Sequence, residues 1–218
     1  MRKKERALGI VEGLKKEYPL AECTLDYANA WQLLVGVRLA AQCTDARVNI
    51  VTSELFEKYP SPAALAAASP DEIEAIVKPC GLGHTKARDI SLCMNELMEK
   101  YDGNVPNDFD KVLALPGVGR KSANLIMGDV FGKPAIVTDT HCIRLCGRMG
   151  LTKNKEPKKV EMDLWKLIPP EESNDFCHRL VLHGRAVCDA RKPQCERCAV
   201  KEYCETYEKQ QKQLHTDT

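Results

Sequence analysis

The chain has 218 residues, of which 44% are apolar and 29% are charged, a composition typical of a water-soluble globular protein. Its 32 basic and 31 acidic residues leave a formal net charge of +1, which excludes a uniformly basic nucleic-acid-coating protein and restricts any polyanion site to a local patch. Arg38 interrupts the most apolar run, at 33–41, so we expect neither a transmembrane helix nor a membrane partner.

Cysteine is unusually frequent: there are eleven, an odd number, so they cannot all pair with one another. The basic N-terminus has no signal-peptide core, since Glu12, Lys15 and Lys16 interrupt it. We therefore expect a cytoplasmic protein whose cysteines are metal ligands or free thiols and form no disulfides.

Hydrophobic periodicity and capping residues predict helices along almost the whole chain. The segment 27–42 is apolar nearly all round and should be the most buried helix. Ser69 to Glu72 supplies an N-cap, a first-turn proline and a capping-box glutamate. The expected helices cover 2–18, 27–42, 44–59, 69–77, 84–101, 108–115, 119–131, 139–149, 156–167 and 171–185.

Strand signals are almost absent, because only Ala135 to Thr138 is β-like and one short run has no partner strand. The fold class predicted is therefore all-α. The polar tail after Cys204 is expected to fray. Arg38 and Gln42 lie four residues apart in a predicted helix, so they should share one face. The Arg38 guanidinium then needs a partner, for which carboxylates such as Asp45 and Asp139 are candidates; alternatively, its stem packs while its head reaches solvent or a neighbouring helix.

Cys188, Cys195, Cys198 and Cys204 have the spacing C-x6-C-x2-C-x5-C, which indicates a metal site. Structural zinc usually takes its cysteines as two tight pairs. Only one pair is tight here, so the wider loops favour a four-iron cluster, with zinc as the alternative. The surrounding cations either bind phosphates or offset the charge of the cluster; they are Arg185, Arg191, Lys192, Arg197 and Lys201.

The sequence Leu-Pro-Gly-Val-Gly-Arg-Lys-Ser-Ala at 115–123 lies between two predicted helices. Phosphate loops and dinucleotide fingerprints follow a strand, so both are excluded. A helix-hairpin-helix remains, in which Gly117 and Gly119 let the backbone approach a phosphate and the N–H groups of the second helix point at it. The alternative is a tight interhelical turn without a ligand.

Lys121 and Asp139 stand at the starts of two successive predicted helices. The helix dipole disfavours a cation at Lys121, so this residue is a phosphate contact, an amine nucleophile of lowered pKa or a tolerated surface lysine. Asp139 is either a functional carboxylate or a simple N-cap. The extended segment 132–138 is long enough to return the chain, so both residues can face one cleft.

These motifs resemble those of the endonuclease III family. The hairpin at 115–123, the segment Thr138-Asp139-Thr140-His141 and the four-cysteine spacing carry the resemblance, and Ala41 to Asp45 and Gly81-Leu82 add to it. The resemblance covers nearly the whole chain. It implies a base-excision-repair DNA N-glycosylase with apurinic/apyrimidinic (AP) lyase activity and a [4Fe-4S] cluster.

The family fold implied is a helix-hairpin-helix DNA glycosylase of two helical lobes with a DNA cleft between them. One lobe would be a six-helix barrel over 22–132, including the helix-hairpin-helix at about 108–131. The second would combine 1–21 with 133–218 and carry the cluster loop, 188–204. The implied partner is double-stranded DNA with damaged or abasic nucleotides, and we expect a nucleoid-associated monomer.

The resemblance also implies roles for individual residues. Lys121 matches the Schiff-base lysine and Asp139 the catalytic aspartate. Gln42 and Leu82 match residues inserted into the duplex, and the hairpin residues Gly117, Val118 and Gly119 would bind DNA. The four cysteines would hold the cluster. The implied reaction removes oxidised pyrimidines and cleaves 3′ to the abasic site by β-elimination.

Two departures from the family pattern leave the lesion and opposite-base preferences open. Arg38 stands where the family usually has an apolar residue, and Gly83-His84 replaces a bulkier pair. The alternatives are a non-catalytic helix-hairpin-helix DNA-binding module stabilised by a metal cluster, a monofunctional adenine-mismatch glycosylase and an electron-transfer protein. The mismatch glycosylase is disfavoured because it lacks a lysine at 121 and has a further domain.

Overall fold

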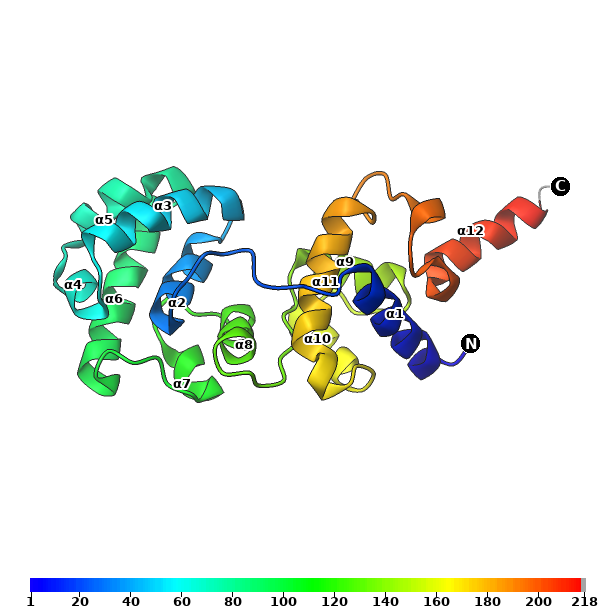
Figure 1. Ribbon diagram of the computed structural model, residues 1–218, viewed down its shortest axis with the longest axis horizontal. Coiled ribbons are helices and arrows are strands. Elements are labelled where there is room, and N and C mark those ends of the chain that lie inside the picture. Colours follow the sequence, from blue (N-terminus) through cyan, green and yellow to red (C-terminus); the bar gives the residue numbers. More distant parts are fainter. Residues whose placement is uncertain (217–218) are drawn as a thin grey trace. The chain divides into compact units, whose positions relative to one another are not determined.

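The computed structural model describes residues 1–216 and divides them into two compact units (Figure 1). We call residues 23–133 the hairpin unit, and residues 1–22 together with 134–218 the cysteine unit. Residues 1–216 contain helices, turns and extended segments and no β-strand, which confirms the all-α prediction. None of the helices in this part of the chain is long and apolar enough to cross a membrane.

The hairpin unit is built around α6 (Gly83–Tyr101), which packs against α2, α4 and α5. Its buried face includes Ile90, Met94 and Leu97. The other α-helices of this unit are α2 (Ala30–Leu39), α3 (Asp45–Lys58), α4 (Pro62–Ala67), α5 (Pro70–Val77), α7 (Phe109–Ala114) and α8 (Arg120–Asp129); the 3-10 turn η1 (Lys78–Cys80) leads into α6.

Side-chain caps fix where most of these helices begin, because they satisfy N–H groups that have no partner inside the helix. Ser69 and Glu72 form the expected capping box of α5. The caps of the other capped helices in this unit are Asn29, Thr44, Ser61 and Asp108. The start of α8 has no side-chain cap.

In the cysteine unit, α11 (Ser173–Ala186) packs against α1 (Lys3–Glu17) and α9 (Thr140–Arg148). The β-like run Ala135 to Thr138 is buried beside α11. The Ala135 N–H donates to Ser173 Oγ at 3.1 Å and the Val137 N–H to Cys177 Sγ at 3.2 Å. Side chains of a helix therefore satisfy this extended backbone, and no second strand is needed. The remaining elements are α10 (Pro157–Trp165), α12 (Glu205–Thr216), η2 (Pro170–Glu172), η3 (Cys195–Arg197) and η4 (Lys201–Tyr203).

Two helices were missed by the sequence analysis. The short helix α4 follows a Ser61-Pro62 start that has the same pattern as Ser69-Pro70. The expectation of a frayed tail was wrong, because residues 205–216 form α12. Thr206 Oγ1 donates to the Arg148 carbonyl at 2.7 Å, and Glu208 pairs with Arg6 at 3.1 Å. These tertiary contacts hold a helix whose own sequence is too polar to indicate burial.

We predict that Gly9→Ala destabilises the cysteine unit, although alanine favours helix. A Cβ at Gly9 would overlap ring atoms of Tyr203, so the ring or the η4 turn that carries it would have to move. We expect the free energy of unfolding in urea to fall by about 1–3 kcal/mol. Gly147→Ala in α9 is the control, because its Cβ would meet no atom within 4 Å in the described chain. Gly147→Ala should leave the free energy of unfolding unchanged or raise it by about 0.5 kcal/mol. Equal effects of both changes would contradict the packing argument.

Candidate functional site

The turn between α7 and α8 has the backbone geometry of a tight hairpin. Gly117 has a φ of 74°, and the Val118 N–H donates to the Leu115 carbonyl at 3.1 Å. A Cβ at Gly117 would lie 2.9 Å from Asp89 Cβ and 3.1 Å from Arg38 Cδ. Packing and backbone conformation alone therefore require glycine at position 117.

Gly119 differs from Gly117, because nothing in the unit requires its small size. It is the N-cap residue of α8 with an ordinary φ of −97°, and a Cβ there would meet no atom within 4 Å in the described chain. No side chain caps the first N–H groups of α8. An uncapped helix start with open space in front of it suits a phosphate.

Lys121 is the second residue of α8 and is exposed. Within the hairpin unit, no hydrogen bond or ion pair engages its ammonium. The neighbouring Arg120 instead lies over the Phe109 ring, 5.1 Å from its centroid, which joins the starts of α7 and α8. Lys121 thus presents an amine beside an open helix start, where it can reach a ligand.

Gln42 and Leu82 lie in two turns of the hairpin unit and are both exposed. Their φ angles are 57° and 51°, in the left-handed region that residues other than glycine rarely adopt. The Leu82 residue is 56% exposed, although leucine gains free energy from burial. Both turns therefore hold a side chain outward in a strained conformation that packing inside the unit does not explain.

The expectation that Arg38 and Gln42 share a helix face is wrong, because α2 ends at Leu39. Arg38 pairs with Asp89 of α6, donating from Nε at 3.0 Å and from Nη2 at 2.7 Å. Asp89 is not one of the two named candidates, but it lies on a neighbouring helix, which was the alternative expectation. Asp45 instead accepts from Thr24 Oγ1 at 2.5 Å. The Arg38–Asp89 pair lies against Gly117 and so supports the hairpin from inside the unit.

Asp139 is the N-cap of α9 in the cysteine unit. Its Oδ1 accepts from the Cys142 N–H at 2.7 Å, and the residue is half-buried. The capping role therefore holds, and it fixes the carboxylate at the start of α9. A capping carboxylate that solvent still reaches can also act on a ligand, so the two interpretations of Asp139 are compatible.

Cys188, Cys195, Cys198 and Cys204 line one pocket of the cysteine unit. Zinc holds its sulfur ligands at about 2.3 Å, so its ligands must converge on a point. Among residues 1–216, no three His, Cys, Asp or Glu side chains are placed to hold one metal ion. Four thiols around one pocket are a ligand set that fits an iron–sulfur cluster.

Nitrogen atoms from two helices approach these sulfurs. Arg148 Nη1 of α9 lies 3.4 Å from Cys188 Sγ, and His183 Nε2 of α11 lies 3.3 Å from Cys198 Sγ. Burial raises the pKa of the Cys198 thiol to about 11, so ligation would have to displace its proton. Donors around the sulfurs are typical of the shell that orients metal ligands.

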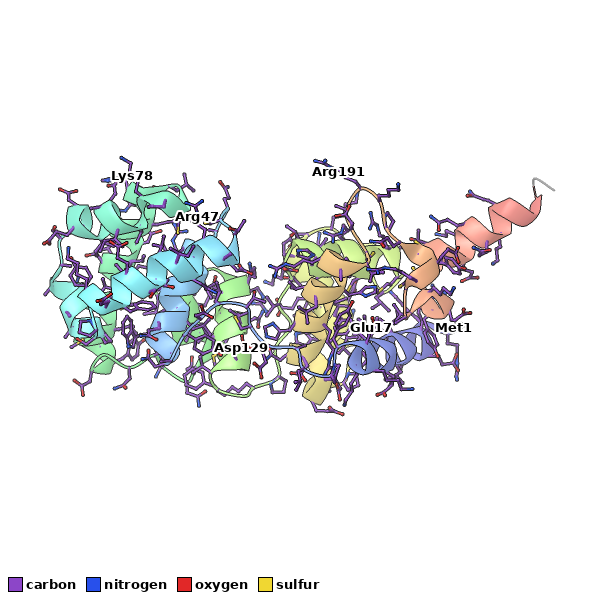
Figure 2. The ribbon with its side chains drawn as sticks, turned by 45° about the horizontal axis from the view of Figure 1, so that its top comes forward. Met1, Glu17, Arg47, Lys78, Asp129 and Arg191 are labelled. Atoms are coloured by element: carbon purple, nitrogen blue, oxygen red, sulfur yellow. The ribbon has the colours of Figure 1, made fainter. Side chains whose placement is uncertain are left out.

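Two of the five cations expected around the cysteines donate to backbone carbonyls. Arg197 donates to the Ala186 carbonyl at 2.7 Å, and Lys201 donates to the Glu196 carbonyl at 2.9 Å. Arg191 and Lys192 are exposed at the turn of the loop, where their N–H groups donate to Asp189 Oδ1 at 2.8 and 3.2 Å. Figure 2 shows Arg191 pointing away from the helices. These two side chains can reach a phosphate.

Comparisons with known proteins match both the hairpin and the cysteine loop. Residues 35–170 match the model described as HhH-GPD superfamily base excision DNA repair protein. Residues 188–204 match the iron-sulfur binding domain of endonuclease III. The endonuclease III of Synechocystis sp. is 47% identical over 93% of this chain and 93% of its own length. The chain belongs to the endonuclease III family.

Other members have the same fold. The endonuclease III of Escherichia coli K12 is 38% identical over 94% of this chain and 98% of its own. A structure of a non-covalent endonuclease III–DNA complex superimposes with a TM-score of 0.91 at 40% identity, covering 97% of this chain and all of that one. A trapped covalent endonuclease III–DNA intermediate gives 0.90 at 40% identity with the same coverage.

Membership defines the class of enzyme. The chain is a base-excision-repair DNA glycosylase and AP lyase with the helix-hairpin-helix fold, and its cofactor is a [4Fe-4S] cluster. Two buried or half-buried residues of α6 have no counterpart among the sequence predictions: Asp89, which pairs with Arg38, and Lys86, whose ammonium donates to the carbonyls of Leu39, Ala41 and Cys80. Their only sequence signal is a charge on the apolar side of a helix, and that pattern does not name a partner.

We predict that Cys198→Ser prevents cluster assembly, because a hydroxyl is a poor ligand for iron. The purified variant should lose the brown absorbance and most of its iron, and its 188–204 loop should become protease-sensitive. Cys23→Ser is the matched control, because Cys23 lies in the hairpin unit. This variant should keep the brown absorbance and the iron. Stoichiometric zinc without iron in the unmodified protein would overturn the cluster assignment.

Proposed function

We propose that this enzyme removes oxidised pyrimidines from duplex DNA with Lys121 as the nucleophile and then cleaves 3′ to the abasic site. The observation that carries the proposal is the free amine of Lys121 beside the uncapped start of α8. A phosphate bound at that helix start would hold the sugar within reach of the amine.

Two places on the chain would bind the DNA backbone. At the hairpin, Gly119 leaves room for a phosphate at the N–H groups of α8, while Gly117 and Val118 set the turn. At the cysteine loop, Arg191 and Lys192 supply exposed positive charge. Both contacts are to phosphates and not to bases, so they position the enzyme without selecting a sequence.

Gln42 and Leu82 would enter the base stack. The glycosidic bond of a stacked base is inaccessible, so the damaged nucleotide has to leave the duplex. Leu82 supplies an apolar wedge, and the Gln42 amide can hydrogen-bond to the base that has lost its partner. These roles are supported by the exposure of both side chains and by the left-handed backbone conformation of both residues.

The reaction then follows from the groups present. The deprotonated Lys121 amine attacks C1′, the bond from C1′ to the base breaks, and the base leaves with that electron pair and takes up a proton. The attached nitrogen then loses a proton and forms a C=N bond as the C1′–O4′ bond breaks, and O4′ takes up a proton, so the sugar opens to an imine. The imine makes the C2′ proton acidic, and its loss breaks the C3′–O bond, so that the 3′ phosphate leaves with that electron pair. The Asp139 carboxylate would accept a proton from the amine and stabilise positive charge that develops on the sugar.

The four cysteines of 188–204 would hold the iron–sulfur cluster. When bound, it supplies a rigid cross-link within the loop and takes no part in bond breaking. Because both steps need only one active lysine, we propose that the enzyme acts as a monomer, associated with the nucleoid where its damaged or abasic substrate occurs.

We predict that Lys121→Ala abolishes borohydride trapping on abasic duplex DNA, because no imine can form without the amine. DNA affinity and unfolding temperature should stay close to those of the parent. Lys111→Ala on α7, also an exposed lysine, is the control and should trap DNA normally. Trapping by Lys121→Ala at the parental rate would favour another nucleophile. Absence of trapping by the parent would favour the non-catalytic DNA-binding module.

Asp139→Asn separates the carboxylate charge from the cap. Asparagine caps helices about as well as aspartate, so the unfolding free energy should change by less than about 0.5 kcal/mol. Base release should slow by about a hundredfold or more, because the charge and the proton acceptor are lost. Single-turnover kinetics on a duplex with one oxidised pyrimidine measure this. Unchanged base release would leave Asp139 as a cap only.

A further inference from the structure

Lys86 of α6 is a lysine with no exposed surface. Its ammonium donates to three backbone carbonyls, those of Leu39 at 2.8 Å, Ala41 at 2.7 Å and Cys80 at 2.8 Å. An ammonium has three donors, so all of them are used. No carboxylate pairs with it in the described part of the chain.

The three carbonyls belong to the two turns that carry Gln42 and Leu82. Leu39 is the last residue of α2 and Ala41 directly precedes Gln42, while Cys80 ends η1 two residues before Leu82. The Lys86 N–H also donates to the Leu82 carbonyl at 3.0 Å. The Lys86 side chain therefore contacts both turns, and its backbone N–H makes the ordinary first-turn bond of α6 to the residue that caps this helix.

A buried charge at this place is costly, and packing alone does not require it. Desolvation lowers the pKa of the Lys86 ammonium, so the charged form is less favourable here than in water. The carbonyls at the C-terminus of α2 offset part of this cost, because that end of a helix is negative. An apolar side chain would fill the same space without the cost, but it could not join two separate backbones.

The conformation of the two turns shows what the contact achieves. Only three residues other than glycine have a positive φ in the described chain, and Gln42 and Leu82 are two of them. Such residues return to ordinary backbone angles unless their surroundings hold them. Carbonyls fixed just before each of these positions supply that restraint.

We propose that Lys86 is a positioning residue that holds the Gln42 and Leu82 turns in one fixed arrangement, ready to enter the duplex together. The inference rests on the proposed roles of Gln42 and Leu82 in DNA. In addition, the Gln42 amide and the Leu82 wedge act as one rigid pair. The spacing of this pair has to match the spacing of the two DNA strands around a flipped nucleotide.

A merely structural role and a positioning role predict different substrate dependence. Single-stranded abasic DNA has no base stack to enter, so its reaction with Lys121 does not need either turn. Duplex abasic DNA needs both. Loss of positioning therefore lowers the duplex rate relative to the single-strand rate, while general destabilisation lowers both rates by the same factor.

The test uses Lys86→Met in the full-length, cluster-loaded enzyme. Borohydride trapping rates are measured on one abasic oligonucleotide, alone and annealed, with one preparation. We expect the ratio of duplex to single-strand rates to fall by about tenfold or more, because small misplacements cost large factors in rate. Lys100→Met on the same helix is the control; Lys100 is exposed and pairs with Glu96, so the parental ratio should persist.

A double-variant cycle makes the test specific to the wedge. In the parent, Leu82→Ala should lower the ratio of duplex to single-strand rates. In the Lys86→Met background the same change should lower this ratio much less, because a misplaced Leu82 side chain already contributes little to the duplex rate. A parental ratio in Lys86→Met, or full additivity of the two changes, would overturn the proposal. If the parent traps no DNA at all, or Leu82→Ala leaves the ratio unchanged, the proposed function or the wedge assignment is at fault instead.

Hydrogen exchange on the unmodified enzyme gives an answer even if Lys86→Met does not fold. The Cys43 N–H, bonded to the Ala40 carbonyl, and the Gly81 N–H, bonded to the Lys78 carbonyl, report on the two turns. A shared anchor should make them open together, with equal opening free energies. Clearly different opening free energies would show that the turns move independently and would reject the proposal.

Discussion

The turns and the cysteine loop of this protein are held by buried or half-buried cationic side chains. These side chains donate hydrogen bonds to backbone carbonyls. Turns leave carbonyls without helical partners, and a buried carbonyl needs a donor. Lys86 supplies donors to the turns after α2 and η1. In the cysteine unit, Arg144 donates to the carbonyls of Gly184 and Cys188, and Arg148 donates to those of Asp189 and Ala190. The proposed DNA-contacting turns and the cysteine loop thus depend on the same kind of interaction.

Support through backbone carbonyls suits the segments that we propose contact DNA. A turn fixed through its carbonyls keeps its outward side chain free, as Leu82 and Arg191 are. An ion pair between side chains would occupy the groups that the ligand needs. Binding then requires little further ordering of the chain, and ordering is one of the main costs of association.

The parts of the fold that depend on local sequence were predictable. The Ser69–Glu72 capping box, the hairpin at 115–123 and the Asp139 cap all lie where the sequence placed them, because short-range rules govern each of them. The cysteine spacing likewise indicated its cofactor without any knowledge of tertiary structure.

Apart from α4, whose start has a local signal, the misses have the opposite cause. The end of α2 at Leu39 is stabilised by Lys86, which lies 47 residues further along the chain, and apolar periodicity contains no trace of that contact. The tail forms α12 because Arg6 and the Arg148 carbonyl bind it. The partner of Arg38 is likewise 51 residues away. Local helix propensity cannot predict where a helix ends or which residues pair when a charged residue far along the chain determines it.

These distant contacts explain the most unusual residue near the hairpin. Arg38 was expected beside Gln42, but its guanidinium binds Asp89 and contacts Gly117. Asp89 lies three residues after Lys86, so the two project from neighbouring positions on α6. A single helix therefore supports the hairpin through Asp89 and the two exposed turns through Lys86. In this chain the Arg38 side chain is therefore part of what supports the hairpin.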